Sequence, residues 1–153
     1  MSSELDKFLQ EIQSKLEADY SDTAIDHARN PRNVGSIPNA DGFGSATGEC
    51  GDTMGIWLKV DNDRIKNITF WTDGCGTTIA SGSMATELAK GKTVIEAAKI
   101  GQQTILDALE GLPDDSRHCA QLAADSLHQA IKDYLVYKKE PWKRAYRKQE
   151  ESY

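Results

Sequence analysis

The sequence is short of three things: cysteine, basic charge and long apolar runs. Its three cysteines are an odd number, which excludes a fully paired disulfide framework. No run is apolar and long enough to cross a bilayer, and residues 1–19 carry charges of both signs where a secretory signal has an apolar block. We therefore expect no membrane partner and a reducing compartment, the cytoplasm.

The net charge of −6 is distributed unevenly. Residues 138–153, called the basic tail below, contain six Lys and Arg against three Glu, which leaves a net charge of −9 on residues 1–137. A nucleic-acid-binding protein needs a basic face against the phosphates, so the acidic body argues against a nucleic-acid partner. The basic tail, which also holds Trp142, is either a solvated helix end or a docking surface.

Helical periodicity appears at both ends of the chain. Residues 3–17 place their apolar side chains on one face of an amphipathic helix, which fills most of an extra N-terminal segment, residues 1–18. Ser21 is expected to cap a second, short helix, and residues 30–42 form a loop rich in Gly, Pro and Asn. A long C-terminal helix is expected over residues 117–138.

The middle of the chain alternates with a period of two. Met54, Ile56, Leu58 and Val60 are expected on one buried face of a strand that pairs with residues 65–72 as an antiparallel hairpin. Residues 43–47 add a third strand. The sequence therefore predicts a single α+β domain over residues 1–153: a small three-stranded antiparallel sheet, helices packed on one face, an extra N-terminal helix and a long C-terminal helix.

Each cysteine stands at the boundary of an expected element, beside glycine or histidine. Between them lie 24 and 43 residues, so the fold must bring the sulfurs together. Thiolates favour soft metals, and glycine neighbours let a bulky inorganic group approach the backbone. A helix N-terminus favours the thiolate form of the second and third cysteines. The motifs are Cys50-Gly51-Asp52, Gly74-Cys75-Gly76 and His118-Cys119.

Two further residues have more than one interpretation. Asp52 either faces the same way as Cys50 and gives a hard, weakly held oxygen ligand among sulfurs, or closes a local Asx turn. His118 either ligates metal, orients Cys119 or caps the helix start. His27 and His128 have no ligand pattern around them and are expected to be structural or solvated.

Taken together, the motifs resemble the IscU/NifU-type iron–sulfur cluster assembly scaffold family over about residues 19–136. The resemblance implies a carrier rather than an enzyme: cysteine desulfurase supplies sulfur, and a cluster, expected as 2Fe–2S, forms on the protein and passes to apo-acceptors. Cys50, Cys75 and Cys119 would be ligands, Asp52 the labile carboxylate and His118 an alternative fourth ligand. The matching runs are residues 27–35, 48–52, 72–76 with 79–81, and 118–119 with 122–123.

Three alternatives follow from the residues and the resemblance. The first is the scaffold, and the second is a zinc-dependent sulfurtransferase that accepts persulfide sulfur on Cys119. The third is a zinc-stabilised interaction domain. The related sulfurtransferase branch resembling SufU has an insertion between the second and third cysteines and lacks the His-Cys pair. Because this chain has neither departure, the scaffold is favoured, with zinc as an occupant of the apo form.

One segment departs from the family pattern. The family's site for a specialised Hsp70-type chaperone, Leu-Pro-Pro-Val-Lys, is replaced here by Leu112-Pro113-Asp114-Asp115-Ser116. The loss of the second proline and the lysine argues against that chaperone as a partner. The chain lacks the further cysteine cluster of full-length NifU proteins, so a stand-alone scaffold is expected, and the sequence leaves a homodimer open.

Overall fold

A computed structural model describes residues 3–10, 20–49 and 51–143. Helices and strands follow the expected order, and α4 begins with a capping box formed by Thr93 and Glu96. The elements are α2 (Asp22–Arg29), β1 (Gly42–Thr47), β2 (Thr53–Asp61), β3 (Arg64–Thr72), α3 (Gly76–Ala89), α4 (Val94–Ala97), α5 (Gln102–Ala108), the 3-10 turn η1 (Asp114–Ser116), α6 (Arg117–Lys139) and the 3-10 turn η2 (Pro141–Lys143).

The three strands form one antiparallel sheet in the order β1-β2-β3, as the sequence predicts. Asn62 and Asp63 join β2 to β3 with positive φ angles of 53° and 61°, the backbone of a tight primed hairpin turn. The expected loop at residues 30–42 adds one unforeseen feature. Val34 forms a parallel bridge with Phe70, which covers the outer edge of β3.

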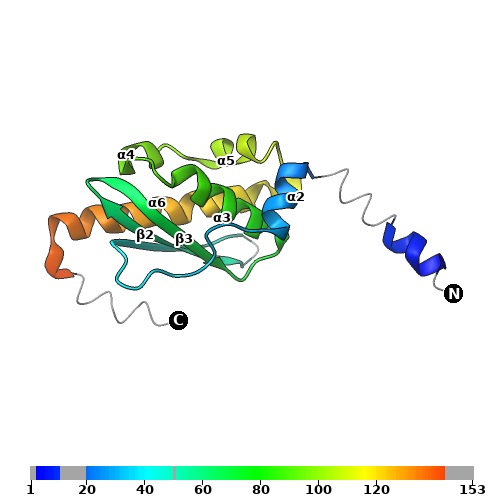
Figure 1. Cartoon of the computed structure of the whole chain (residues 1–153), viewed down its shortest axis with the longest axis horizontal. Coiled ribbons are helices and arrows are strands. Elements are labelled where there is room, and N and C mark those ends of the chain that lie inside the picture. Colours follow the sequence, from blue (N-terminus) through cyan, green and yellow to red (C-terminus); the bar gives the residue numbers. More distant parts are fainter. Residues whose placement is uncertain (1–2, 11–19, 50, 144–153) are drawn as a thin grey trace.

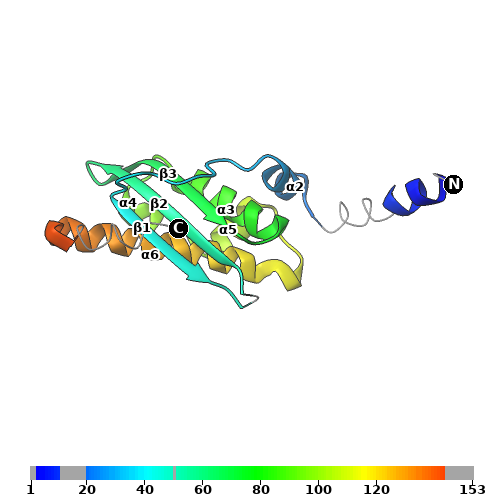
Figure 2. The same cartoon turned by 90° about the horizontal axis from the view of Figure 1, so that it is seen from below.

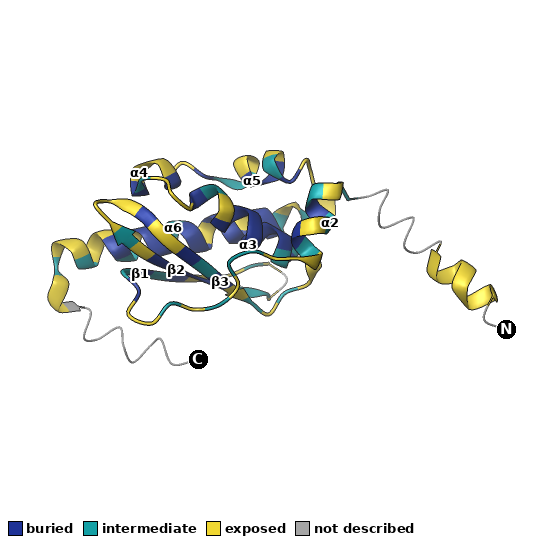
Figure 3. Cartoon of the chain, in the orientation of Figure 1, coloured by how far each residue is buried: buried dark blue, intermediate teal, exposed yellow. Residues whose placement is uncertain are grey.

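The helices cover one face of the sheet, as expected (Figure 2). Met54, Ile56 and Leu58 of β2 are fully buried against them. Val60 is only half-buried, because a bulge between Lys59 and Val60 interrupts the alternation. Figure 3 shows buried residues concentrated along α3 and along one side of α6.

The long helix α6 lies directly on β1, and glycine makes this approach possible. A Cβ atom on Gly44 would lie 2.2 Å from the backbone nitrogen of Ala130, and one on Gly42 would lie 2.5 Å from the Ala130 carbonyl oxygen. On the opposite face of the sheet, the rings of Phe43 and Trp57 pack with their centroids 4.9 Å apart. The glycines of β1 therefore let the second half of α6 pack directly against the sheet.

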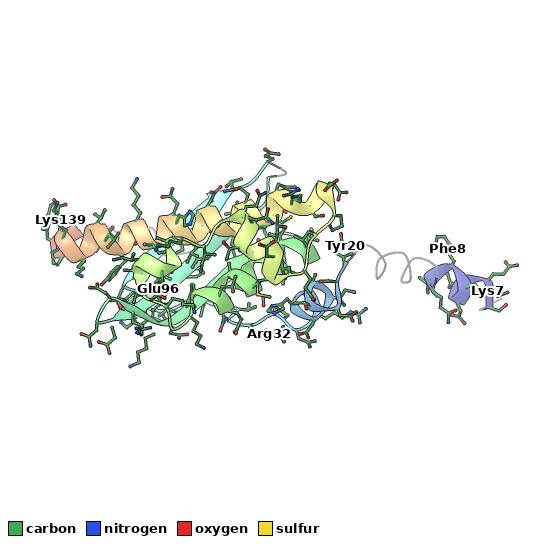
Figure 4. All side chains as sticks on the ribbon, turned by 90° about the horizontal axis from the view of Figure 1, so that it is seen from above. Lys7, Phe8, Tyr20, Arg32, Glu96 and Lys139 are labelled. Carbon is green, nitrogen blue, oxygen red and sulfur yellow. The ribbon has the colours of Figure 1, made fainter. Side chains whose placement is uncertain are left out.

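Residues 3–10 are helical, as expected, while the rest of the predicted N-terminal helix lies outside the described residues. The apolar side chains of Leu5, Phe8 and Leu9 are all more than half exposed, and Figure 4 shows Phe8 projecting from this helix. Across residues 3–10, 20–49 and 51–143, no helix has the length and apolar character needed to span a membrane.

Candidate functional site

Cys75 stands where β3 passes into α3. It is the N-cap of α3, is exposed and is a free thiol. Its sulfur lies 3.2 Å from the hydroxyl of Thr77. That hydroxyl, with the backbone amides of Thr78 and Thr77, holds the pKa of the Cys75 thiol below its usual value, while partial burial opposes the shift. The helix start therefore favours a thiolate here, as the sequence predicts.

Asp52 stands between a tight turn and β2. Backbone hydrogen bonds close the turn, since the Gly51 amide donates to the Gly48 carbonyl at 3.0 Å and Gly51 has a φ of 85°. The Asp52 side chain points elsewhere: its Oδ2 accepts a hydrogen bond from the Thr78 hydroxyl at 3.1 Å. The carboxylate thus faces the start of α3.

Cys119 stands in the first turn of α6 and is buried, with 3% of its surface exposed. Polar groups surround its sulfur. The hydroxyls of Thr77 and Thr78 lie 3.5 and 3.4 Å away, and His118 Nε2 lies 3.7 Å away. Burial alone would fit a small core residue, but these neighbours give the sulfur a polar setting.

These contacts join three segments at one end of the molecule: the β1–β2 turn, the start of α3 and the start of α6 (Figure 1). Asp52, Cys75, His118 and Cys119 therefore lie near one another. Cys50, the remaining predicted ligand, lies outside the described residues. Among the residues that are described, no group of three or more His, Cys, Asp and Glu side chains is arranged to hold a metal ion.

Sequence reasoning missed Thr77 and Thr78, whose hydroxyls link the thiols to each other and to Asp52. Their only sequence signal is their position directly after Cys75-Gly76. The two remaining histidines are structural, as expected. His27 is buried with Nδ1 2.7 Å from Ser83 Oγ, and His128 Nε2 lies 2.6 Å from the Ile100 carbonyl oxygen.

The fold and the site together define an α+β domain that gathers thiols, a carboxylate and an imidazole at the ends of its elements. Residues 19–141 match the family described as the NifU-like N terminal domain. The chain belongs to this family.

Curated relatives agree with this assignment. An Archaeoglobus fulgidus protein named iron–sulfur cluster assembly scaffold protein IscU 1 is 53% identical over 117 residues, which cover 76% of each chain. An Aquifex aeolicus protein named iron–sulfur cluster assembly scaffold protein IscU is 43% identical over 121 residues, which cover 77% of each chain.

A solved structure shares the fold. The crystal structure of a SUF-system protein, FiSufU, from Fervidobacterium islandicum AW-1 matches with a TM-score of 0.62 at 22% identity. The match covers 74% of this chain and 97% of that chain. At this identity the likeness concerns the fold alone.

Proposed function

We propose that this protein is a scaffold on which an iron–sulfur cluster is built from iron and desulfurase-derived sulfur and then passed to apo-proteins. The observation that carries the proposal is the meeting of Asp52, Cys75 and Cys119 around the Thr78 hydroxyl. Two thiols suit soft iron, and a carboxylate is a harder and more easily displaced ligand. The names of the relatives support the same role.

In this proposal the cluster is bound by the sulfur atoms of Cys50, Cys75 and Cys119. Asp52 is a displaceable oxygen ligand, and His118 is an alternative fourth ligand. The expected cargo is a 2Fe–2S cluster, and zinc is an occupant of the cargo-free protein. The protein is a carrier and not an enzyme. A reducing compartment such as the cytoplasm is its proposed setting, because the thiols must stay unoxidised.

The proposed partners are a cysteine desulfurase and apo-acceptors, and an isologous homodimer stays open. An Hsp70-type chaperone is not expected. Asp114 and Asp115 of η1 are exposed, and they place negative charge where the family motif has its second proline and its valine. The zinc sulfurtransferase is not favoured, because the relatives are named as scaffolds.

Purification under argon tests the proposal. We expect visible iron–sulfur absorption bands with acid-labile sulfide in the wild type, and loss of most cluster when Cys50, Cys75 or Cys119 is replaced by Ser. Cooperative unfolding should survive each substitution, since serine is close to cysteine in size and neither Cys75 nor Cys119 belongs to the main apolar cluster. His128→Gln is the matched control, because His128 contacts the Ile100 carbonyl outside the site.

Two results with the protein as purified would overturn the scaffold assignment. One is cluster retained in all three cysteine variants. The other is a colourless protein with stoichiometric zinc that turns over persulfide sulfur, the behaviour of the sulfurtransferase. If the protein binds zinc but does not turn over persulfide sulfur, the next experiment is reconstitution with ferrous iron and sulfide. Failure to form a cluster in that experiment also rejects the scaffold.

A further inference from the structure

The buried hydroxyl residues of α3 differ in what their side chains contact, and Ser83 lies 2.7 Å from His27 Nδ1 of α2. Ser81 donates to the Thr77 carbonyl at 2.8 Å, and Thr86 donates to the Ser83 carbonyl at 2.8 Å. Such bonds to the preceding turn are common for hydroxyl residues in helices. Thr78 is fully buried, yet its hydroxyl is directed at side chains from two other segments.

The Thr78 hydroxyl has one hydrogen and three candidate partners. Asp52 Oδ2 lies at 3.1 Å, Cys119 Sγ at 3.4 Å and Cys75 Sγ at 3.9 Å. A hydroxyl donates one hydrogen bond at a time, so Asp52 and Cys119 compete for the same hydrogen. Thr77 lies near both sulfurs as well, but the contact with Asp52 belongs to Thr78.

The loop before Cys75 holds Thr78 in place. A Cβ atom on Gly74 would lie 2.6 Å from the Thr78 Cβ, so the glycine lets the loop close tightly over the threonine. The Thr72 hydroxyl accepts a hydrogen bond from the Gly74 amide at 3.1 Å and donates one to the Thr53 carbonyl at 2.7 Å. The Thr78 hydroxyl is therefore fixed relative to β2, the strand that follows Asp52.

We propose that Thr78 is a positioning residue whose hydroxyl sets the Asp52 carboxylate and the Cys119 sulfur toward a common centre before cargo binds. This inference rests on the proposed scaffold function. Binding of a metal to either group releases the shared hydrogen to the other, so Thr78 couples Asp52 to Cys119. Residues that orient ligands in this way commonly change metal affinity by about 10- to 100-fold when altered.

Cobalt(II) binding to the cargo-free protein tests this role, because thiolate-to-cobalt absorption bands report sulfur ligation directly. Thr78→Val keeps the shape of the side chain and removes the hydroxyl, so we expect about tenfold weaker cobalt binding. Thr78→Ser should restore binding to within about threefold of wild type. The matched control is Thr86→Val, which removes a buried hydroxyl from the same helix and should bind as wild type.

A double-mutant cycle with Asp52→Ala separates positioning from simple packing. If Thr78 acts by orienting Asp52, then Thr78→Val should lower the cobalt affinity by a clearly smaller factor in the Asp52→Ala protein than in the wild type. A packing role predicts equal costs in the two backgrounds. If Thr78→Val unfolds, Thr78→Ser and Thr78→Ala provide the same comparison, because these two variants differ only in the hydroxyl.

Each of three results would overturn the inference. They are equal cobalt affinity in wild type and Thr78→Val, no recovery of affinity in Thr78→Ser, and additive losses of cobalt affinity in the double-mutant cycle. These outcomes are distinct from failure of the proposed function. A wild type that gives thiolate–cobalt bands but never accepts an iron–sulfur cluster rejects the scaffold and leaves the positioning role standing. A wild type without thiolate–cobalt bands rejects both.

Discussion

The two described thiols of the site differ in their surroundings. Cys75 is exposed, and the Thr77 hydroxyl and nearby backbone amides lower its pKa, so it keeps more thiolate near neutral pH than an ordinary cysteine. Cys119 is buried beside the hydroxyls of Thr77 and Thr78 and the ring of His118. If the two thiols bind metal as proposed, an incoming ion would meet Cys75 first at the surface and Cys119 deeper in the site.

Asp52 gives a prediction at the scale of a single residue. Asp52→Ala should leave a cluster that is bound but passes to an apo-acceptor about tenfold more slowly, which corresponds to roughly 1.4 kcal/mol in the barrier. The reason is that a hard, displaceable oxygen ligand is removed while the sulfur ligands stay. Transfer from the preloaded protein can be followed by absorbance or circular dichroism.

The control for this prediction is Asp125→Ala, which removes a carboxylate that accepts a hydrogen bond from Gln121 at 2.8 Å on an exposed part of α6. Its transfer rate should equal that of the wild type. Equal or faster transfer from Asp52→Ala would reject the role of Asp52 as the displaceable ligand.

Residue types and their order single out Asp52, Cys75 and the His118-Cys119 pair as candidates, but not the hydroxyl contacts that link them. Glycine-flanked cysteines and the His118-Cys119 pair are visible in the sequence. The hydroxyl of Thr78 is not, because its role depends on how the turn before β2 packs against the start of α3. Contacts between three separate segments are set by tertiary packing, which local patterns do not encode.

At the scale of elements, the contact between β1 and α6 sets how closely the helix that bears Cys119 packs on the sheet. A Cβ atom on Gly44 would be 2.2 Å from the Ala130 nitrogen and 2.5 Å from the Gln129 carbonyl carbon. Both are backbone atoms, so neither can turn aside as a side chain would. Substitution here must push α6 away from the sheet and shift its whole length, including the turn that bears Cys119.

We therefore predict that Gly44→Ala lowers the free energy of unfolding by about 3 kcal/mol or more, and the melting temperature by roughly 10 °C. Gly101→Ala is the matched control, since a Cβ there meets no atom within 4 Å. It should melt within about 2 °C of the wild type. Thermal unfolding of the cargo-free variants followed by circular dichroism checks both values, and equal melting of the two variants would contradict the close-contact argument.

The elements themselves were the most predictable part of the fold. The hairpin follows from two local signals: the apolar alternation at Met54, Ile56 and Leu58, and the turn-forming residues 61–63. The bridge between Val34 and Phe70 has no such signal. It is made by two backbone hydrogen bonds, from the Gly35 amide to the Phe70 carbonyl and from the Phe70 amide to the Asn33 carbonyl, and the loop thereby covers part of the open edge of β3.

At the scale of the whole molecule, the site and the first residues of the basic tail, Lys138 and Lys139, lie at opposite ends of α6. Cys119 is in its first turn and Lys139 is its last residue, about 30 Å away along the helix axis. Figure 4 shows Lys139 at the end of the molecule opposite Tyr20. Within the described part of the tail, Lys138 pairs with Asp63 at 2.5 Å and Trp142 is 63% exposed. Arg144, Arg147 and Lys148 lie outside the described residues.

This separation leads to a prediction for partner docking. If the basic tail steers an acidic surface of the desulfurase, Arg144→Glu with Arg147→Glu should weaken that complex about tenfold at low salt. Metal binding should not change, because Arg144 and Arg147 are remote in sequence from Cys119. The wild-type complex should also weaken between about 0.05 and 0.5 M salt, as the Debye length shortens.

A control variant must separate the effect of overall net charge on desulfurase binding from the effect of charge in the tail. Lys90→Glu with Lys92→Glu makes the same change in net charge at two exposed residues between α3 and α4. If the tail is the docking surface, this control binds the desulfurase like the wild type at each salt concentration. Equal weakening by both double variants would indicate long-range charge rather than a local surface. If neither salt nor either charge-reversal variant changes the affinity for the desulfurase, the docking surface lies elsewhere and the tail is a solvated helix end.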